Sequence, residues 1–179
     1  MNGNAPAEAS GNHAQWSKTT VVWMFVAFAL FIILATLGLV LRLFQANALA
    51  GLDPAWFYAL LTLHGLGMVG TWYVGAMAAV SHRLTRFADP SLRINLAAMV
   101  GTVVGVVLLL AATLLGKFGT GWYFLHPLPF HGAGVWDDWA AVVFFFALGV
   151  LGVTWTIWTL SLLHAIARKY SLARALAWQ

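Results

Sequence analysis

The amino-acid sequence predicts an all-α membrane protein with four transmembrane helices, and two observations carry this prediction. The first is composition: 62% of the 179 residues are hydrophobic, 8% are charged, and the mean hydropathy is +0.86. Soluble domains carry roughly a quarter charged residues, so this chain has too little polar surface to face water. The second is the presence of apolar stretches that are each long enough to cross about 30 Å of hydrocarbon at about 1.5 Å per helical residue.

The four predicted spans cover about residues 20–41, 56–80, 94–116 and 139–164. They form one four-helix transmembrane domain over residues 19–179. Residues 1–18 are polar and rich in Ala, Asn and Gly, which predicts a disordered N-terminal tail. This segment does not open a signal peptide, because the apolar run after it is long and no small-residue cleavage site is evident.

The basic residues predict how the chain is oriented. With four spans, the N-terminus, the second connection and the C-terminus share one side of the membrane. Seven of the nine basic residues fall on that side: Lys18, Arg83, Arg86, Arg93, Arg168, Lys169 and Arg174. The positive-inside rule therefore places both termini in the cytoplasm. Because these residues are scattered at the ends of apolar runs, we expect contact with the lipid bilayer and no nucleic-acid partner.

The residue types that the chain lacks exclude several chemistries. It has no cysteine, which excludes disulfides, thiolate metal sites, covalent c-type haem attachment and cysteine nucleophiles. The predicted spans contain neither Asp nor Glu, so no proton-conducting carboxylate can be proposed within them. There is no Gly-x-Ser-x-Gly elbow and no phosphate loop. No catalytic residue is predicted.

One histidine lies inside an apolar span. His64 is roughly 12 Å below the outer end of the second span at about 1.5 Å per residue. On a helix, Thr71 lies nearly in line with His64, and Gly67 and Met68 flank it, so the imidazole stands on a strip of mostly small side chains. The residues alone leave two interpretations open: an axial ligand of haem iron, or a hydrogen bond across helices to a backbone carbonyl or a threonine.

The other histidines give weaker patterns. His126 and His131 lie in the third connection at a spacing that fits no strong metal signature; an interfacial role or contact with haem propionates is the alternative. His82 and His164 lie near the inner ends of the second and fourth spans, where they either approach one another or extend to the interface.

A Gly-x-x-x-Gly pair, Gly101 and Gly105, lies within the third span. Small residues at this spacing allow close approach of a neighbouring helix, although glycine is common in membrane helices. The pair predicts a packing face.

Two segments resemble a known family. Thr62-Leu-His-Gly-Leu-Gly-Met68 resembles the Thr-x-His-Gly-x-x-Met segment in the second helix of subunit I of the haem-copper (cytochrome c) oxidases. After the third span, Gly121-Trp-Tyr-Phe-Leu-His-Pro-Leu128 resembles the Trp-Thr-x-Tyr-Pro-Pro-Leu segment of the same subunit. The resemblance begins at about residue 20, covers nearly all of the chain, and is closest to the B-type branch of the family.

The resemblance implies a fold like helices 1–4 of that subunit and a role for His64 as one of two axial ligands of a low-spin haem, of b or a type. Gly67, Met68 and Thr71 would then lie beside the cofactor. It also implies membership of a respiratory, electron-transporting oxidoreductase complex in a bacterial or archaeal plasma (inner) membrane, fed indirectly by a cytochrome or another electron donor.

The chain also departs from the family pattern. It lacks the helices that carry the copper-ligating histidines, the high-spin haem ligand and the second low-spin ligand. His126 stands in place of one proline of the Pro-Pro pair, and Leu125 in place of the tyrosine before it. Gly70 and Thr71 stand where the family often has phenylalanine. We therefore do not expect this chain to reduce oxygen alone.

Two functions follow as hypotheses. In the first, the chain is the N-terminal part of a split oxidase subunit I, with His64 as one haem ligand and a partner chain supplying the remaining helices, the second axial ligand and the oxygen-reducing centre. In the second, it is a non-catalytic four-helix paralogue that acts as an accessory, assembly or stand-alone haem-binding subunit.

Overall fold

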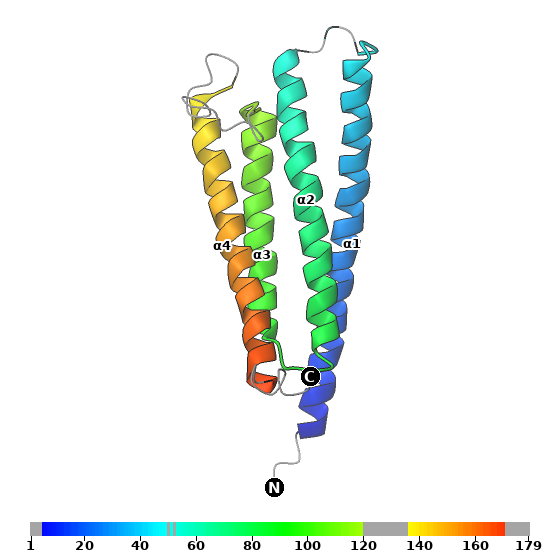
Figure 1. Ribbon diagram of the computed structural model, residues 1–179, viewed down its shortest axis with the longest axis vertical. Coiled ribbons are helices and arrows are strands. Elements are labelled where there is room, and N and C mark those ends of the chain that lie inside the picture. The colour runs from blue at the N-terminus through cyan, green and yellow to red at the C-terminus, as the bar shows by residue number, and fades with distance from the viewer. Residues whose placement is uncertain (1–4, 50, 52, 120–135, 171–179) are drawn as a thin grey trace, which may run out of the picture.

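The computed structural model describes residues 5–49, 51, 53–119 and 136–170, and these contain helices and no strand. The helices are α1 (Ala5–Gln45), α2 (Pro54–Leu84), α3 (Leu92–Leu110) and α4 (Asp138–Lys169), with a short π-helix, η1 (Ala111–Leu115), continuing α3 (Figure 1). Four stretches are long and apolar enough to cross a membrane: Ala14–Gln45, Pro54–Leu84, Leu92–Leu115 and Asp138–Lys169. The predicted fold class, an all-α protein with four transmembrane helices, is confirmed.

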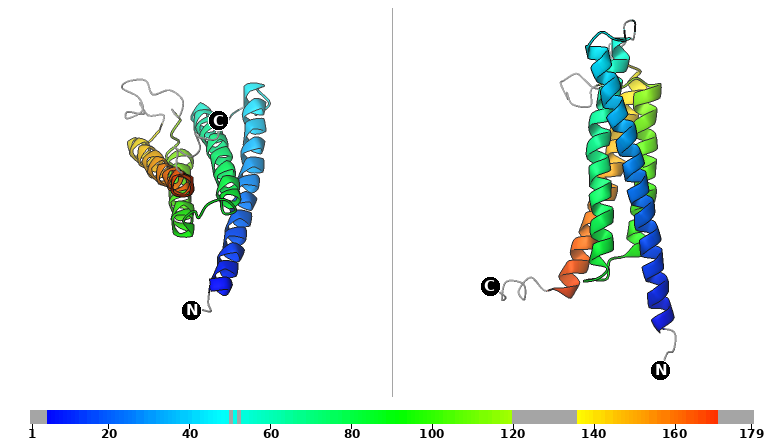
Figure 2. Two further views of the ribbon diagram at one scale, coloured as in Figure 1. Left: turned by 60° about the horizontal axis from the view of Figure 1, so that its bottom comes forward. Right: turned by 90° about the vertical axis from the view of Figure 1, so that its right-hand side faces the viewer.

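The helices run up and down in sequence order (Figures 1 and 2). Helix α1 begins and α4 ends at the bottom of the view, and the α2–α3 connection lies there too; we call this the terminal end. The opposite end, where α1 ends and α2 begins, is called the loop end. The start of the first helix and the end of the last one thus share one side, as four spans require. That this side is cytoplasmic stays a prediction.

Helix α1 begins at Ala5, inside the segment for which composition predicts a tail. Alanine is the strongest helix former, and Ala5, Ala7 and Ala9 lie in this first stretch, which gives a local reason for the helical backbone. The domain boundary at residue 19 and the disorder of residues 1–18 stay predictions.

Side chains at the helix starts satisfy backbone N–H groups that have no partner within the helix. The Asp53 carboxylate accepts a hydrogen bond from the Ala55 N–H at 2.9 Å, and Pro54, which has no N–H to satisfy, takes the first helical position. The Ser91 hydroxyl oxygen accepts one from the Ile94 N–H at 3.4 Å at the start of α3. These residues fix where α2 and α3 begin.

The Gly-x-x-x-Gly pair of α3 packs against α4. A Cβ at Gly101 would lie 2.5 Å from Thr154 Oγ1, and a Cβ at Gly105 would lie 2.5 Å from Leu151 Cγ. Atoms without a bond between them do not approach so closely, so a larger residue would force α3 and α4 apart. The predicted packing face is confirmed.

Aromatic and polar side chains join the α1–α2 and α3–α4 hairpins in the half of the bundle near the terminal end. Trp23 of α1 stacks on Trp158 of α4, with ring centroids 5.3 Å apart. Its indole N–H donates a hydrogen bond to the buried Asn95 side-chain oxygen of α3 at 3.1 Å. Helix α1 is therefore tied to both helices of the other hairpin.

Tyr73 ties α2 to the same region. Its ring stacks on Trp155 of α4 at a centroid distance of 4.6 Å, and its hydroxyl lies 2.7 Å from Thr159 Oγ1. The Trp155 indole N–H in turn donates to Thr102 of α3 at 3.0 Å. Each hydrogen bond between membrane helices contributes about 0.6 to 2 kcal/mol. Together, Trp23, Tyr73, Asn95, Trp155 and Trp158 form what we call the cross-helix cluster.

A second apolar core lies nearer the loop end. Phe118 and Phe144 are fully buried and stacked at its centre, with centroids 4.3 Å apart. The other buried members come from α3, η1 and α4, and Leu63 and Leu66 of α2 pack against them. Helix α1 contributes no residue to this cluster within the described chain. At the level of this core, α1 thus depends on its contacts with α2.

An ion pair joins two segments of the chain at the loop end. Lys117 Nζ lies 3.2 Å from Asp53 Oδ2 and 5.5 Å from the centroid of the Trp56 ring. The Ala55 N–H and the Lys117 ammonium both favour the ionised carboxyl, so they lower the pKa of Asp53 below its ordinary value. The pair joins the start of α2 to the segment that follows η1.

The close contact at Gly105 predicts the effect of a larger residue. Replacing Gly105 with Leu places atoms where Leu151 stands and should lower the free energy of unfolding by about 1 to 3 kcal/mol. The matched control is Gly152→Leu on α4, because nothing lies within 4 Å of a Cβ there. Unfolding in mixed detergent micelles measures both; equal losses would contradict the packing at Gly105.

The ion pair predicts a pH-dependent stability difference. Because the folded-state pKa of Asp53 is depressed, its contribution to stability is present above the unfolded value of about 3.9 and is lost as pH falls through the folded pKa. Asp53→Asn should lower the melting temperature at pH 7, and the gap to the parent protein should narrow in acid. A gap independent of pH would contradict this account.

Candidate functional site

His64 is held against the backbone of α1. It lies roughly 15 Å along α2 from Pro54 at about 1.5 Å per residue, and its Nδ1 is 2.8 Å from the carbonyl oxygen of Leu34. A carbonyl oxygen can only accept, so Nδ1 carries the proton, and in the neutral imidazole Nε2 keeps its lone pair. The structure therefore contains the hydrogen bond across helices that the sequence left open, and this bond occupies only one ring nitrogen.

Gly38, one turn after Leu34 on α1, makes room for the ring. A Cβ at this position would lie 2.7 Å from His64 Cε1 and 3.2 Å from Nε2. Any side chain here would displace the imidazole from Leu34. Leu34 and Gly38 thus form a cradle for the ring, one giving the acceptor and the other the space.

The donor chemistry of this site fits haem iron. Metal-ligating histidines usually donate their second N–H to a backbone carbonyl or carboxylate, which fixes the tautomer and orients the ring. His64 has this arrangement, and Leu34 is its only hydrogen-bond partner among the described residues. The ring is partly buried, and no group of the described residues forms a hydrogen bond with Nε2.

The strip of small residues beside His64 faces α1. A Cβ at Gly67 would lie 2.7 Å from Leu34 Cδ2, so this glycine lets α1 approach closely. Thr71 is buried and Met68 is partly buried on the same helix. The structure thus gives Gly67 a packing role that the sequence did not predict. Contact of Gly67, Met68 and Thr71 with a cofactor stays a prediction.

The remaining histidines are not gathered around His64. His82 and the exposed His164 lie near the ends of their helices, at the terminal end of the bundle. The Nδ1 of His82 is buried and has no hydrogen-bond partner in the described chain. His126 and His131 lie outside the described residues. Among the residues that the structure does describe, no group of three or more His, Cys, Asp or Glu side chains can hold a metal ion.

The fold and this site describe a multi-pass helical membrane protein with one oriented imidazole between two of its helices. The family model of cytochrome c and quinol oxidase polypeptide I matches residues 18–178. The chain therefore belongs to this family, whose members bind haem. The resemblance seen at Thr62–Met68 is confirmed at the level of the family. Comparison with curated proteins and with solved structures finds no match.

Sequence reasoning missed Leu34 and Gly38. A signal was present in the hairpin register: α1 and α2 are antiparallel and joined by a short connection, so Gly38 and His64 lie at comparable distances from it. A glycine opposite a histidine at matching depth indicates a ring lodged against a backbone. No pattern in the sequence points to the backbone carbonyl of Leu34 itself.

The cradle predicts that a single methyl group disturbs His64. In Gly38→Ala the new Cβ collides with the ring, so the Nδ1 hydrogen bond should lengthen or break. Nitrogen-15 NMR of histidine-labelled protein, with His64 assigned by substitution, reports the tautomer: the parent should show Nδ1–H, and the variant a mixture.

The matched control is Gly75→Ala, in which the new Cβ lies 3.6 Å from Ala27 Cβ, an ordinary contact. Its His64 signals should equal those of the parent. A parent spectrum showing the Nε2–H tautomer would contradict the geometry, and an unchanged Gly38→Ala spectrum would contradict the role of Gly38.

Proposed function

We propose that this chain is the N-terminal four-helix portion of a haem-copper terminal oxidase subunit I, and that His64 provides one axial ligand of its low-spin haem. The oxygen-reducing centre and the second axial ligand belong to a partner chain. The observation that carries the proposal is the Nδ1–H bond to Leu34, which leaves Nε2 as the free donor. Family membership over residues 18–178 supports it independently.

Haem, when bound, supplies a one-electron couple at iron that passes electrons toward oxygen reduction. The contribution of this chain is positional. Leu34 holds the tautomer, Gly38 leaves space for the ring, and close α1–α2 packing at Gly67 keeps the Leu34 carbonyl in place. Because the bond lies within a predicted membrane span, no water competes for it, and the ring orientation is maintained.

The position of the described histidines supports a partner chain. His82 and His164 lie near the terminal end, separated from His64 along their helices, and would be poorly placed to hold the same haem. Large apolar side chains such as Phe25, Phe28 and Trp72 are exposed on α1 and α2, so the bundle has apolar surface available for further helices as well as for lipid. In the orientation we propose, His64 lies nearer the outer face.

Substitution of the ligand tests the proposal. In the complex purified with its native partners, His64→Ala should abolish the absorption band of the low-spin haem, because the iron loses one of its two axial nitrogens. His164→Ala, on an exposed position near the terminal end, is the matched control and should keep the band. Survival of the band in His64→Ala would overturn the ligand assignment.

The partner is tested separately. Affinity purification of the full chain from native membranes should recover a second polypeptide that carries the histidine-rich helices missing here. If His64-dependent haem copurifies with this chain alone, the split-subunit proposal is wrong and a stand-alone haem-binding paralogue is favoured. If neither haem nor such a polypeptide copurifies, an accessory role without cofactor is favoured.

A further inference from the structure

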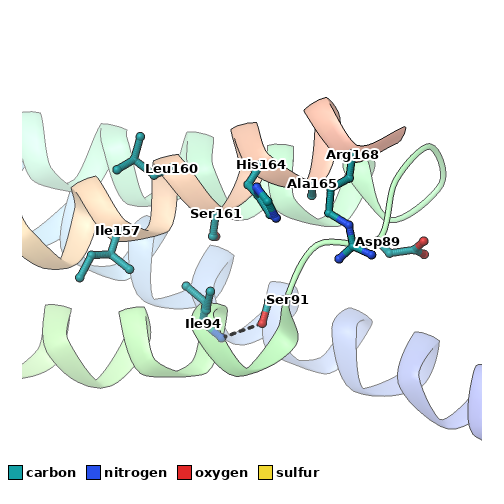
Figure 3. A pocket seen from close by; sticks show the side chains of 9 residues that line it. All are labelled: Asp89, Ser91, Ile94, Ile157, Leu160, Ser161, His164, Ala165 and Arg168. Atoms are coloured by element: carbon teal, nitrogen blue, oxygen red, sulfur yellow. Dashed lines mark hydrogen bonds between the residues drawn. The ribbon is translucent and has the colours of Figure 1, made fainter. Parts of the chain in front are cut away.

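A groove opens between α3 and α4 at the terminal end, far from His64 (Figure 3). Its volume is about 360 Å³. Its lining changes character along its length: Asp89, Ser91, His164 and Arg168 lie toward the ends of the helices, whereas Ile94, Ile157 and Leu160 lie deeper along the bundle (Figure 3). One end of the groove is therefore polar and charged, and the other is apolar.

A second hollow continues the groove along the same helix pair. It shares Ile94 and Ile157 with the first and adds Arg93, Ala97 and Thr154. We call the groove and the second hollow together the furrow. From Arg168 to Thr154 the furrow follows α4 over roughly 21 Å at about 1.5 Å per residue. This length is close to one leaflet of a bilayer whose hydrocarbon is about 30 Å thick and whose headgroup layers add to that. A furrow of this length matches one lipid molecule standing along the helices.

Charge at the polar end favours a phosphate. Arg168 lines this polar end together with Ser91, whereas Arg93 lines the second hollow, and neither arginine takes part in an ion pair within the described residues. The Ser91 oxygen already accepts the Ile94 N–H, which leaves its own O–H free to donate. Guanidinium and hydroxyl donors at one place are the groups that bind phosphate oxygens.

Asp89 restricts which lipid headgroup can bind at the polar end. Asp89 lines the same polar end beside Arg168, and its carboxylate is turned away from the Arg168 guanidinium (Figure 3). A carboxylate repels phosphate but accepts hydrogen bonds from an ammonium or a hydroxyl. The pair thus fits a headgroup that has both a phosphodiester and a hydrogen-bond donor, as ethanolamine and glycerol headgroups have and choline does not.

We propose that this furrow binds one phospholipid of the leaflet at the terminal end. The phosphodiester lies against Arg168 and Ser91, the headgroup donor against Asp89, and one acyl chain along Ile94 and Ile157. Ile157 and Leu160 are 52% and 58% exposed, so the acyl chain covers apolar surface that the protein itself leaves open. The lipid would cover the seam between α3 and α4.

The test uses the full chain in nanodiscs of phosphatidylethanolamine and phosphatidylglycerol, released into mild detergent for native mass spectrometry. We expect one retained phospholipid per chain. Arg168→Gln should reduce retention about tenfold, the equivalent of one charge-assisted hydrogen bond. Lys169→Gln removes a neighbouring cation that does not line the furrow and should leave retention unchanged. Equal losses in the two variants would overturn the proposal in favour of general surface attraction.

Further variants test the acyl chain and the headgroup. Ile157→Trp fills the furrow without changing charge and should also abolish retention, with an unchanged melting temperature as the check on folding. Asp89→Asn should remove the preference for phosphatidylethanolamine over phosphatidylcholine. Three results would each overturn the proposal. The lipid is still retained in Ile157→Trp, inorganic phosphate alone displaces the lipid, or a copurifying polypeptide occupies Ile157 in place of the lipid.

Discussion

A histidine N–H within hydrocarbon must find an acceptor, and in this chain the acceptor is the backbone of the neighbouring helix. The carbonyl of Leu34 is available only if α1 approaches α2 to contact distance at this level. Gly38 and Gly67 allow that approach from either side, the first under the ring and the second under the Leu34 side chain. The site and the helix packing are therefore linked, because the hydrogen bond that orients the imidazole requires the same close approach of α1 and α2.

The cross-helix cluster joins the α1–α2 hairpin to the α3–α4 hairpin. Stacked rings and side-chain hydrogen bonds join all four helices near the terminal end, whereas the core cluster near the loop end includes no α1 residue among those that the structure describes. The bundle is tied most completely at the end away from His64. Near the level of His64, α1 and α2 carry exposed apolar side chains, among them Ile32, Leu39 and Val69. The α3–α4 furrow, by contrast, belongs to the opposite end.

Much of the fold could be predicted because its determinants are local. Apolar runs predicted the helices, and the glycines of the third span predicted the packing face of α3. The candidate site was predicted only in part. A motif indicates which histidine matters, but the Leu34 carbonyl has no signature, since every residue carries one. Gly67 illustrates the same limit: its lack of a side chain was evident, while the neighbour that requires it is a residue distant in sequence.

We propose that the free Nε2 of His64 ligates iron, and chemical rescue with imidazole tests this proposal. In the complex with its partners, His64→Gly leaves space where the imidazole stood. Electron paramagnetic resonance of the oxidised complex should show loss of the low-spin ferric signal in this variant and its return when free imidazole is added. A low-spin signal that is unchanged in His64→Gly would contradict the account.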